Sequence, residues 1–167
     1  YKRQDRYYNG ELGEQNYEKA IKWYKRSASQ GYSIAEYNLG YMYYYGLGTK
    51  IDYENALKYF KRAAFKGHVD AQCNLGCMFE DGEGTEQNYK EAEKWYLEAE
   101  KQGDCFAQYN LGNLYMHGKG VNTNYSKAFM LYEKSAMQGY SKAQNILGYM
   151  YEEGIGVEQD FRIAAKW

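Results

Sequence analysis

Apolar positions recur along the chain with the spacing of one helix face. Ala35, Leu39, Met42 and Tyr43 fall at i, i+4, i+7 and i+8, which predicts an α-helix that ends near Gly46. A second apolar run with the same spacing follows a polar turn: Tyr53, Ala56, Tyr59, Phe60 and Ala63. Two helices joined by a short loop are therefore predicted for this stretch.

The helix pair recurs along the chain at a period of 36 residues. Four segments superpose without a gap: AEYNLGYMYYYGLG (35–48), AQCNLGCMFEDGEG (71–84), AQYNLGNLYMHGKG (107–120) and AQNILGYMYEEGIG (143–156). Each copy has an apolar flank that it cannot bury alone, and stacked copies bury such flanks against one another. The sequence therefore predicts an all-α fold of stacked helix-turn-helix repeats.

A pair of glycines one residue apart, such as Gly46 and Gly48, occurs in each of these copies. Such a pair can belong to a phosphate-binding loop, which normally follows a strand and occurs once per domain. No strand is predicted before any of the pairs, and no Lys-Ser/Thr follows them. We therefore interpret the pair as a helix-ending turn, because glycine readily adopts the left-handed conformation that closes a helix.

An Asp or Asn recurs in one column shortly after these turns: Asn16, Asp52, Asn88, Asn124 and Asp160. Side chains of this kind accept hydrogen bonds from the free amides at the start of a helix, and each such cap contributes about 1 kcal/mol. The second helix of each pair is expected to begin after this column. It is expected to end near a further glycine column: Gly31, Gly67, Gly103 and Gly139.

Composition and charge narrow the possible functions. The 21 Lys and Arg residues balance 22 Asp and Glu residues, which leaves a net charge of -1. This balance argues against binding nucleic acid or an anionic membrane through bulk charge. No apolar run approaches the roughly 20 residues of a membrane span. Because the chain begins at Tyr1 without an initiator Met, we expect it to be a fragment of a longer protein.

These columns resemble the Sel1-like repeat family, a relative of the tetratricopeptide repeat. The family pattern, roughly A-x-x-x-LG-x-x-Y-x-x-G-x-G-V-x-x-D followed by an aromatic residue, alanines and a closing glycine, matches three full copies and parts of two more. One domain is expected, with repeats at roughly 1–34 (partial), 35–70, 71–106, 107–142 and 143–167 (truncated). Arg3 and Arg6 stand where a later copy has Leu39 and Met42, so the first helix is expected to be incomplete.

The resemblance implies a right-handed superhelical solenoid that acts as a non-enzymatic adaptor or scaffold, without a cofactor. Members of the family act in signalling, in endoplasmic-reticulum quality control and in bacterial host interaction, so a secreted or lumenal role is the alternative. Some cysteine-rich bacterial members have been described as penicillin-binding or β-lactamase-like. The chain has no Ser-x-x-Lys, Ser-Asp-Asn or Lys-Thr-Gly motif, which argues against that enzymatic alternative.

A partner would bind along the first helices, which usually line the concave surface of such solenoids. With Leu39 and Tyr43 facing the core, the opposite stripe is aromatic in one repeat and acidic elsewhere. Aromatic side chains are favoured anchors at protein interfaces, so we predict that this stripe contacts a peptide or helix of another protein. The predicted binding residues are Tyr37, Tyr41, Tyr44, Tyr45, Asn74, Glu80, Asp81, Tyr109, Asn110, Asn113, His117, Tyr149 and Glu152.

The tyrosines of this stripe and a second ladder of asparagines each have a structural alternative. The tyrosine rings can instead pack only against the first helix of the adjacent repeat. Asn38, Asn74 and Asn110 form a ladder that can either bracket the backbone of a bound peptide or hydrogen-bond to a neighbouring loop.

The cysteines do not predict a metal site or a disulfide framework. Cys73 and Cys77 lie four residues apart, and Cys105 and His117 belong to the next repeat, but nothing in the repeats fixes a zinc geometry. An odd number of cysteines without CxxC spacing favours free thiols in the cytoplasm over the endoplasmic-reticulum lumen or secretion. The glycosylation sequon Asn124-Tyr125-Ser126 points the other way, although Asn124 is already explained as a helix cap.

Overall fold

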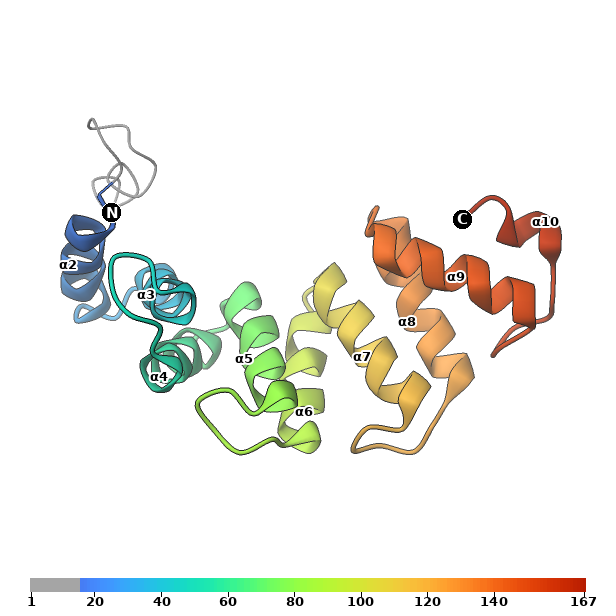
Figure 1. Ribbon diagram of the computed structural model, residues 1–167, viewed down its shortest axis with the longest axis horizontal. Helices are drawn as coiled ribbons and strands as arrows, with labels where there is room; N and C mark the ends of the chain where they lie inside the picture. The colour runs from blue at the N-terminus through green and yellow to red at the C-terminus, as the bar shows by residue number, and fades with distance from the viewer. Residues whose placement is uncertain (1–15) are drawn as a thin grey trace. The chain divides into compact units, whose positions relative to one another are not determined.

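The computed structural model describes residues 16–167, and its regular elements there are all helices (Figure 1). The chain divides into two compact units, Tyr1–Gln87 and Asn88–Trp167. The helices of the first unit are α2 (Tyr17–Ala28), α3 (Ser33–Tyr45), α4 (Tyr53–Ala64) and α5 (Val69–Asp81). Those of the second are α6 (Tyr89–Glu100), α7 (Cys105–His117), α8 (Tyr125–Met137), α9 (Ser141–Glu153) and α10 (Phe161–Ala164). The expected incomplete helix with Arg3 and Arg6 lies outside the described residues.

Within each unit, helices that follow one another in the chain pack against one another. Helix α3 packs on α2 and α4, and α4 packs on α5; in the second unit the chain of contacts runs from α6 through α7, α8 and α9 to α10. The starts of α3, α5, α7 and α9 are spaced by the period that the sequence predicts. The all-α fold of helix-turn-helix repeats is therefore confirmed. Among the described residues, no helix is both long enough and apolar enough to cross a membrane.

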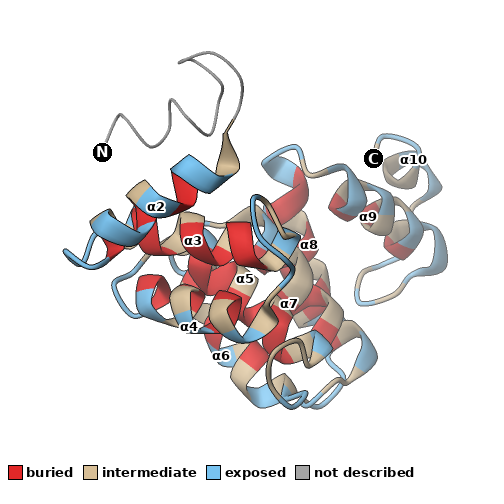
Figure 2. Cartoon of the chain, turned by 60° about the vertical axis from the view of Figure 1, so that its left-hand side comes forward, coloured by how far each residue is buried: buried red, intermediate tan, exposed pale blue. Residues whose placement is uncertain are grey.

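The buried face of each helix is the one that the apolar spacing predicts (Figure 2). Ala35, Leu39 and Met42 of α3 are fully buried. The largest fully buried side chains of the second helices share one column: Tyr24, Phe60, Tyr96 and Tyr132. A Cβ on Gly40 would lie 2.6 Å from the Phe60 ring, and one on Gly112 would lie 2.8 Å from the Tyr132 ring. The glycines of these two Leu-Gly pairs therefore make room for the aromatic ring of the second helix.

The predicted caps are present at the ends of the first helices and at the starts of the second helices. Gly46, Gly82, Gly118 and Gly154 adopt the left-handed conformation at the ends of the first helices. All five predicted Asp and Asn residues accept hydrogen bonds from backbone amides at the starts of the helices that follow them. The interpretation of the glycine pair as a helix-ending turn is confirmed.

The second glycine of each pair has a role beyond the helix-ending turn that the sequence predicts. A Cβ on Gly84 would collide with the backbone of Tyr53, and one on Gly48 would lie 2.7 Å from the carbonyl carbon of Tyr17. Tyr53 and Tyr17 are the first residues of α4 and α2, the second helices of the preceding copies. The absence of a side chain therefore lets each turn pack directly on the preceding repeat.

One polar column is buried among the apolar residues of the first helices. Gln72 and Gln144 donate to the carbonyl oxygens of Ala64 and Ala136, which lie near the ends of α4 and α8 (3.2 Å each). In the first unit the same column holds Glu36, which is 0% exposed and forms ion pairs with Arg62 (2.7 Å) and Lys66 (2.6 Å). The buried Glu36 and Gln72 and the half-buried Gln144 thus tie their first helices to a neighbouring second helix, since a buried polar atom is stable only when it is paired.

Candidate functional site

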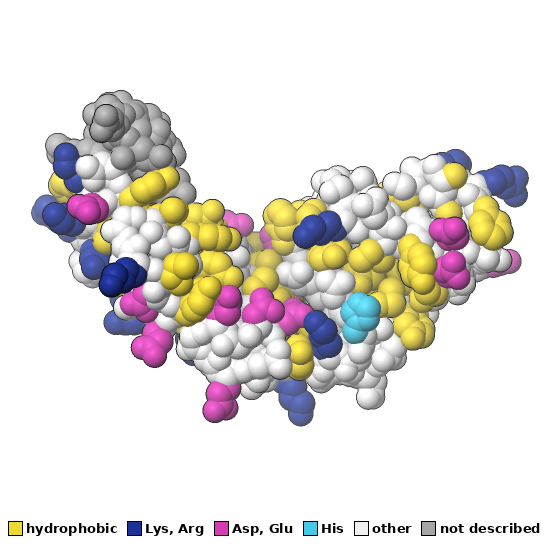
Figure 3. Space-filling view, viewed as in Figure 1, with side chains coloured by type: hydrophobic (Ala, Val, Ile, Leu, Met, Phe, Trp, Pro, Cys, Tyr) yellow, Lys and Arg dark blue, Asp and Glu magenta, His cyan; other side chains and the backbone are white. Residues whose placement is uncertain are grey.

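The predicted tyrosines of α3 form a connected aromatic cluster. Tyr37 stacks on the His68 imidazole, with ring centroids 4.5 Å apart and planes 16° apart, and lies 5.8 Å from Phe60. Tyr41 contacts Tyr45 (4.5 Å) and Tyr37 (6.3 Å). Figure 3 shows hydrophobic side chains gathered over α3, with acidic side chains beside them. The structure therefore brings together the predicted tyrosines of α3.

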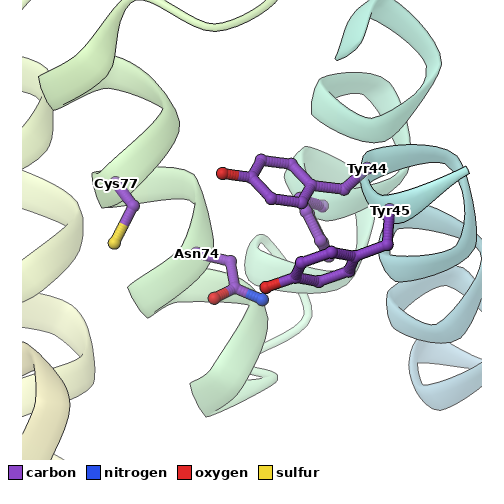
Figure 4. Close-up of a pocket in the computed structure, with 5 residues that line it drawn as sticks. Tyr44, Tyr45, Asn74 and Cys77 are labelled. Carbon is purple, nitrogen blue, oxygen red and sulfur yellow. The ribbon is translucent and has the colours of Figure 1, made fainter. Parts of the chain in front are cut away.

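A pocket of about 130 Å³ opens among α3, α4 and α5 (Figure 4). We call it the aromatic pocket; its lining residues are Tyr44, Tyr45, Phe60, Asn74 and Cys77. In Figure 4, Tyr44 and Tyr45 extend from the end of α3 toward α5, which carries Asn74 and Cys77. Three of these five residues are among the predicted binding residues. The sequence predicts Phe60 only as an apolar residue of the second helix, and it gives Cys77 no binding role.

Glu83 sets the electrostatic character around the aromatic pocket. Burial, followed by hydrogen bonding and the negative charge of Glu83, raises the pKa of Tyr44 above its ordinary value. The same carboxylate is the main cause of the raised pKa of Tyr53. Both phenols therefore stay neutral and face an acceptor. The sequence analysis does not include Glu83 among the binding residues. The other copies have Leu47, Lys119 and Ile155 at this position, so Glu83 is a feature of one repeat.

His68 is held in its neutral form at the start of α5. Its Nδ1 accepts a hydrogen bond from the Ala71 amide (3.4 Å), which a protonated imidazole cannot do. Burial lowers the pKa of His68 below its ordinary value, and the nearby Asp70 carboxylate opposes this shift. The cap and the stacking on Tyr37 account for this residue without a catalytic role.

The free energy of unfolding is expected to decrease as the pH is lowered through the ordinary pKa of histidine. Because the folded state binds the His68 proton less readily than the unfolded chain does, its contribution is complete above the unfolded pKa of about 6.5 and is lost as the pH falls below that value. The variant His68→Asn keeps a capping acceptor that does not titrate in this range. Urea unfolding at roughly pH 7.5 and 5.5 should show a larger loss of unfolding free energy for the wild type than for the variant. Equal losses would contradict the assignment.

The predicted residues of the second unit are distributed over α7 and α9. Tyr109 is half-buried and packs edge-on against Tyr140 (5.0 Å) and tilted against Tyr132 (5.8 Å). Asn113 accepts a hydrogen bond from the Tyr132 hydroxyl (2.8 Å). Tyr149, by contrast, is 54% exposed, and His117 and Glu152 are also exposed. Part of the Tyr109 ring therefore packs within the protein, as the structural alternative to partner binding expects, whereas Tyr149 is open to solvent.

A second, open hollow of about 620 Å³ lies along the turn between α7 and α8. Its floor includes a chain of three side chains. The Tyr115 hydroxyl donates to the Glu93 carboxylate and accepts from the Lys127 ammonium (2.6 Å). The Lys127 ammonium also lies 3.9 Å from the centroid of the Tyr115 ring. Tyr115, Glu93 and Lys127 are thus paired with one another on the floor of this hollow.

Comparison with known proteins identifies the repeated unit. A sequence model of the Sel1 repeat matches residues 5–32, 33–68, 69–104, 105–140 and 141–167. A protective antigen present in uropathogenic Escherichia coli strains, which displays an SLR fold, is 38% identical over 96% of this chain with a TM-score of 0.93. This chain spans 34% of the length of that protein. A Sel1 repeat protein from Oxalobacter formigenes is 34% identical over 98% of this chain and 68% of its own, with a TM-score of 0.91.

More distant structures share the fold. The cysteine rich protein B of Helicobacter pylori is 22% identical over 80% of this chain and 96% of its own, with a TM-score of 0.62. No curated protein sequence matches the chain.

Proposed function

The chain belongs to the Sel1 repeat family, and we propose that it is a non-enzymatic scaffold or adaptor that binds a peptide or helical segment of another protein through its first helices. Proteins built from this repeat are generally protein-interaction scaffolds. The finer assignment, to the stripe on α3, α5, α7 and α9, is our own. It includes all the binding residues predicted from the sequence.

The observation that carries this proposal is the open aromatic surface at the end of α3. Tyr45 is 54% exposed although its ring touches both Tyr41 and Tyr44. Its ring is thus held in place by its neighbours while part of its surface faces solvent. A preordered aromatic ring loses little conformational entropy on binding, which is why tyrosine is frequent among the residues that dominate interface energies.

The titratable groups of the stripe support a binding role rather than a catalytic one. The phenols of Tyr37 and Tyr44 have raised pKa values, chiefly because they are buried, so both stay protonated. A general base needs a pKa near the working pH and a free lone pair. The lone pair of His68 is already occupied by the Ala71 amide.

Removing the two most exposed stripe tyrosines should weaken partner binding. Tyr45→Ala and Tyr149→Ala each delete an exposed aromatic anchor, one in each unit. We expect each substitution to reduce affinity about tenfold for a partner that contacts both units, since truncation of such a residue costs roughly 1–2 kcal/mol. The partner would be identified by proximity labelling with the full-length protein, and its affinity would be measured with the purified chain.

Tyr125→Ala provides a matched control. Tyr125 is 50% exposed, but it begins the second helix α8 and lies outside the stripe. Its substitution should leave affinity unchanged. Unchanged binding by a variant that carries both Tyr45→Ala and Tyr149→Ala, with its helical circular dichroism intact, would count against the stripe as the binding surface.

A second candidate function is an interaction with host molecules outside the cell. It is favoured by the relative from uropathogenic Escherichia coli that is described as a protective antigen. Fractionation of cells that express the full-length protein distinguishes a host-interaction protein from a scaffold inside the cell, because a host-interaction role requires the protein in the medium or on the cell surface.

A further inference from the structure

The aromatic pocket offers ring surfaces at several orientations within a small volume. The Tyr44 and Tyr45 rings meet edge-on, with centroids 4.9 Å apart and planes 72° apart. The Phe60 ring lies 6.4 Å from Tyr44 at 52°. A space of about 130 Å³ admits the end of one side chain and excludes a folded segment. Aromatic ring faces carry partial negative charge and attract cations.

The end of α5 and the turn that follows it, on one side of the aromatic pocket, are acidic. The stretch from Ala71 to Gln87 contains Glu80, Asp81, Glu83 and Glu86 and no Lys or Arg. Helices α3 and α5 both end beside it, and neither carries a basic residue in its last turn. The end of each helix adds a partial negative charge of about half an elementary charge. The acidic residues, the helix ends and the aromatic ring faces therefore all favour a cationic ligand.

A buried carboxylate oxygen provides independent support. Oε2 of Glu83 is buried and has no hydrogen-bond partner in the described part of the chain. Burying such an oxygen without a donor costs free energy, and a bound donor would recover it. The hydrogen bonding and the negative charge of Glu83 both contribute to the raised pKa values of Tyr44 and Tyr53, which places this carboxylate beside Tyr44, a lining residue of the aromatic pocket.

We propose that the aromatic pocket binds an arginine side chain of a basic partner peptide, with Glu83 as the counter-ion. This assignment rests on the proposed function, because it names the chemistry of the partner at one part of the stripe. Arginine fits better than lysine because its flat guanidinium stacks on aromatic rings and donates to a carboxylate in a fixed geometry. The rings would hold the guanidinium faces, and the unpaired Glu83 oxygen would accept its hydrogen bond.

The probe is a displayed library of random peptides selected on the purified chain. We expect the selected peptides to share an arginine. Replacing that arginine by citrulline, which keeps the shape and removes the charge, should weaken binding about tenfold in a fluorescence titration. Glu83→Gln and Tyr45→Ala should each weaken binding of the arginine peptide by a similar factor. Glu86→Gln removes the same charge from an exposed position of the same loop and should change affinity by about twofold or less.

The outcomes separate this inference from the proposed function. Selected peptides without arginine, or with arginine that citrulline replaces at no loss, would overturn the pocket assignment and leave peptide binding in place. A lysine peptide of equal affinity would overturn the choice of arginine. No selected peptide at all would count against both. Tyr45 is exposed, so its variant keeps the test valid even if Glu83→Gln disturbs folding.

Discussion

Gly84→Ala is expected to lower the free energy of unfolding by about 3 kcal/mol, because two costs add at this position. Gly84 has φ +68°, and an alanine in this left-handed region is strained by roughly 1–2 kcal/mol. Its Cβ would also collide with the Tyr53 carbonyl, which belongs to the first turn of α4 and cannot rotate away as a side chain could. Urea denaturation followed by helical circular dichroism measures the loss.

Gly67→Ala separates the two costs. Gly67 lies in the same unit with φ +82°, and nothing lies within 4 Å of the Cβ that alanine would add. This control should show only the conformational cost, roughly 1–2 kcal/mol. If both variants lose the same free energy, the close approach of the turn to α4 contributes nothing, and the second glycine serves only to form the bend.

The comparison of these glycines shows what a repeated sequence can and cannot predict. Periodicity identified the helices, their buried faces and their caps, because each depends on residues a few positions apart. The second glycine was interpreted through its own turn alone. Its actual neighbour, the first residue of a helix 31 positions earlier, as in Gly84 and Tyr53, becomes visible only once copies are stacked. Contacts between copies leave no local pattern, so they were missed.

The candidate site was predictable in part for the same reason. The stripe of Tyr37, Tyr41, Tyr44 and Tyr45 follows from helix geometry, and the structure places these rings together. The aromatic pocket also requires Phe60 from a different helix and the charge of Glu83 from a turn. The residues that correspond to Glu83 in the other copies have unlike side chains, so the repeat pattern itself does not single out Glu83. The only sequence signal for Glu83 is that it differs from the residues at the same position in the other copies.

Gln108→Glu is expected to lower the free energy of unfolding by about 3 kcal/mol, since it places a charge at a buried position without a cationic partner. Gln108 is 4% exposed, and its side-chain oxygen accepts a hydrogen bond from Gln138 (2.8 Å). The corresponding residues of the first unit are Glu36 and Lys66. Each donor also binds the carbonyl of an equivalent glycine: Lys66 binds Gly31 (2.8 Å) and Gln138 binds Gly103 (3.0 Å). The same contact is thus made by a charged pair, Glu36 and Lys66, in one repeat and by a neutral pair, Gln108 and Gln138, in the other.

Adding Gln138→Lys to Gln108→Glu should recover most of this loss, because it recreates the ion pair seen between Glu36 and Lys66. Recovery is expected to be incomplete, since Glu36 also pairs with Arg62, while the equivalent Lys134 is engaged with Glu100 (2.7 Å). Gln138→Lys alone keeps a donor for the Gln108 oxygen and should cost less than about 1 kcal/mol. A double-mutant cycle on unfolding free energies gives the coupling. Strictly additive losses would mean that the two side chains do not depend on each other, and each copy could then change its polar column independently of its neighbour.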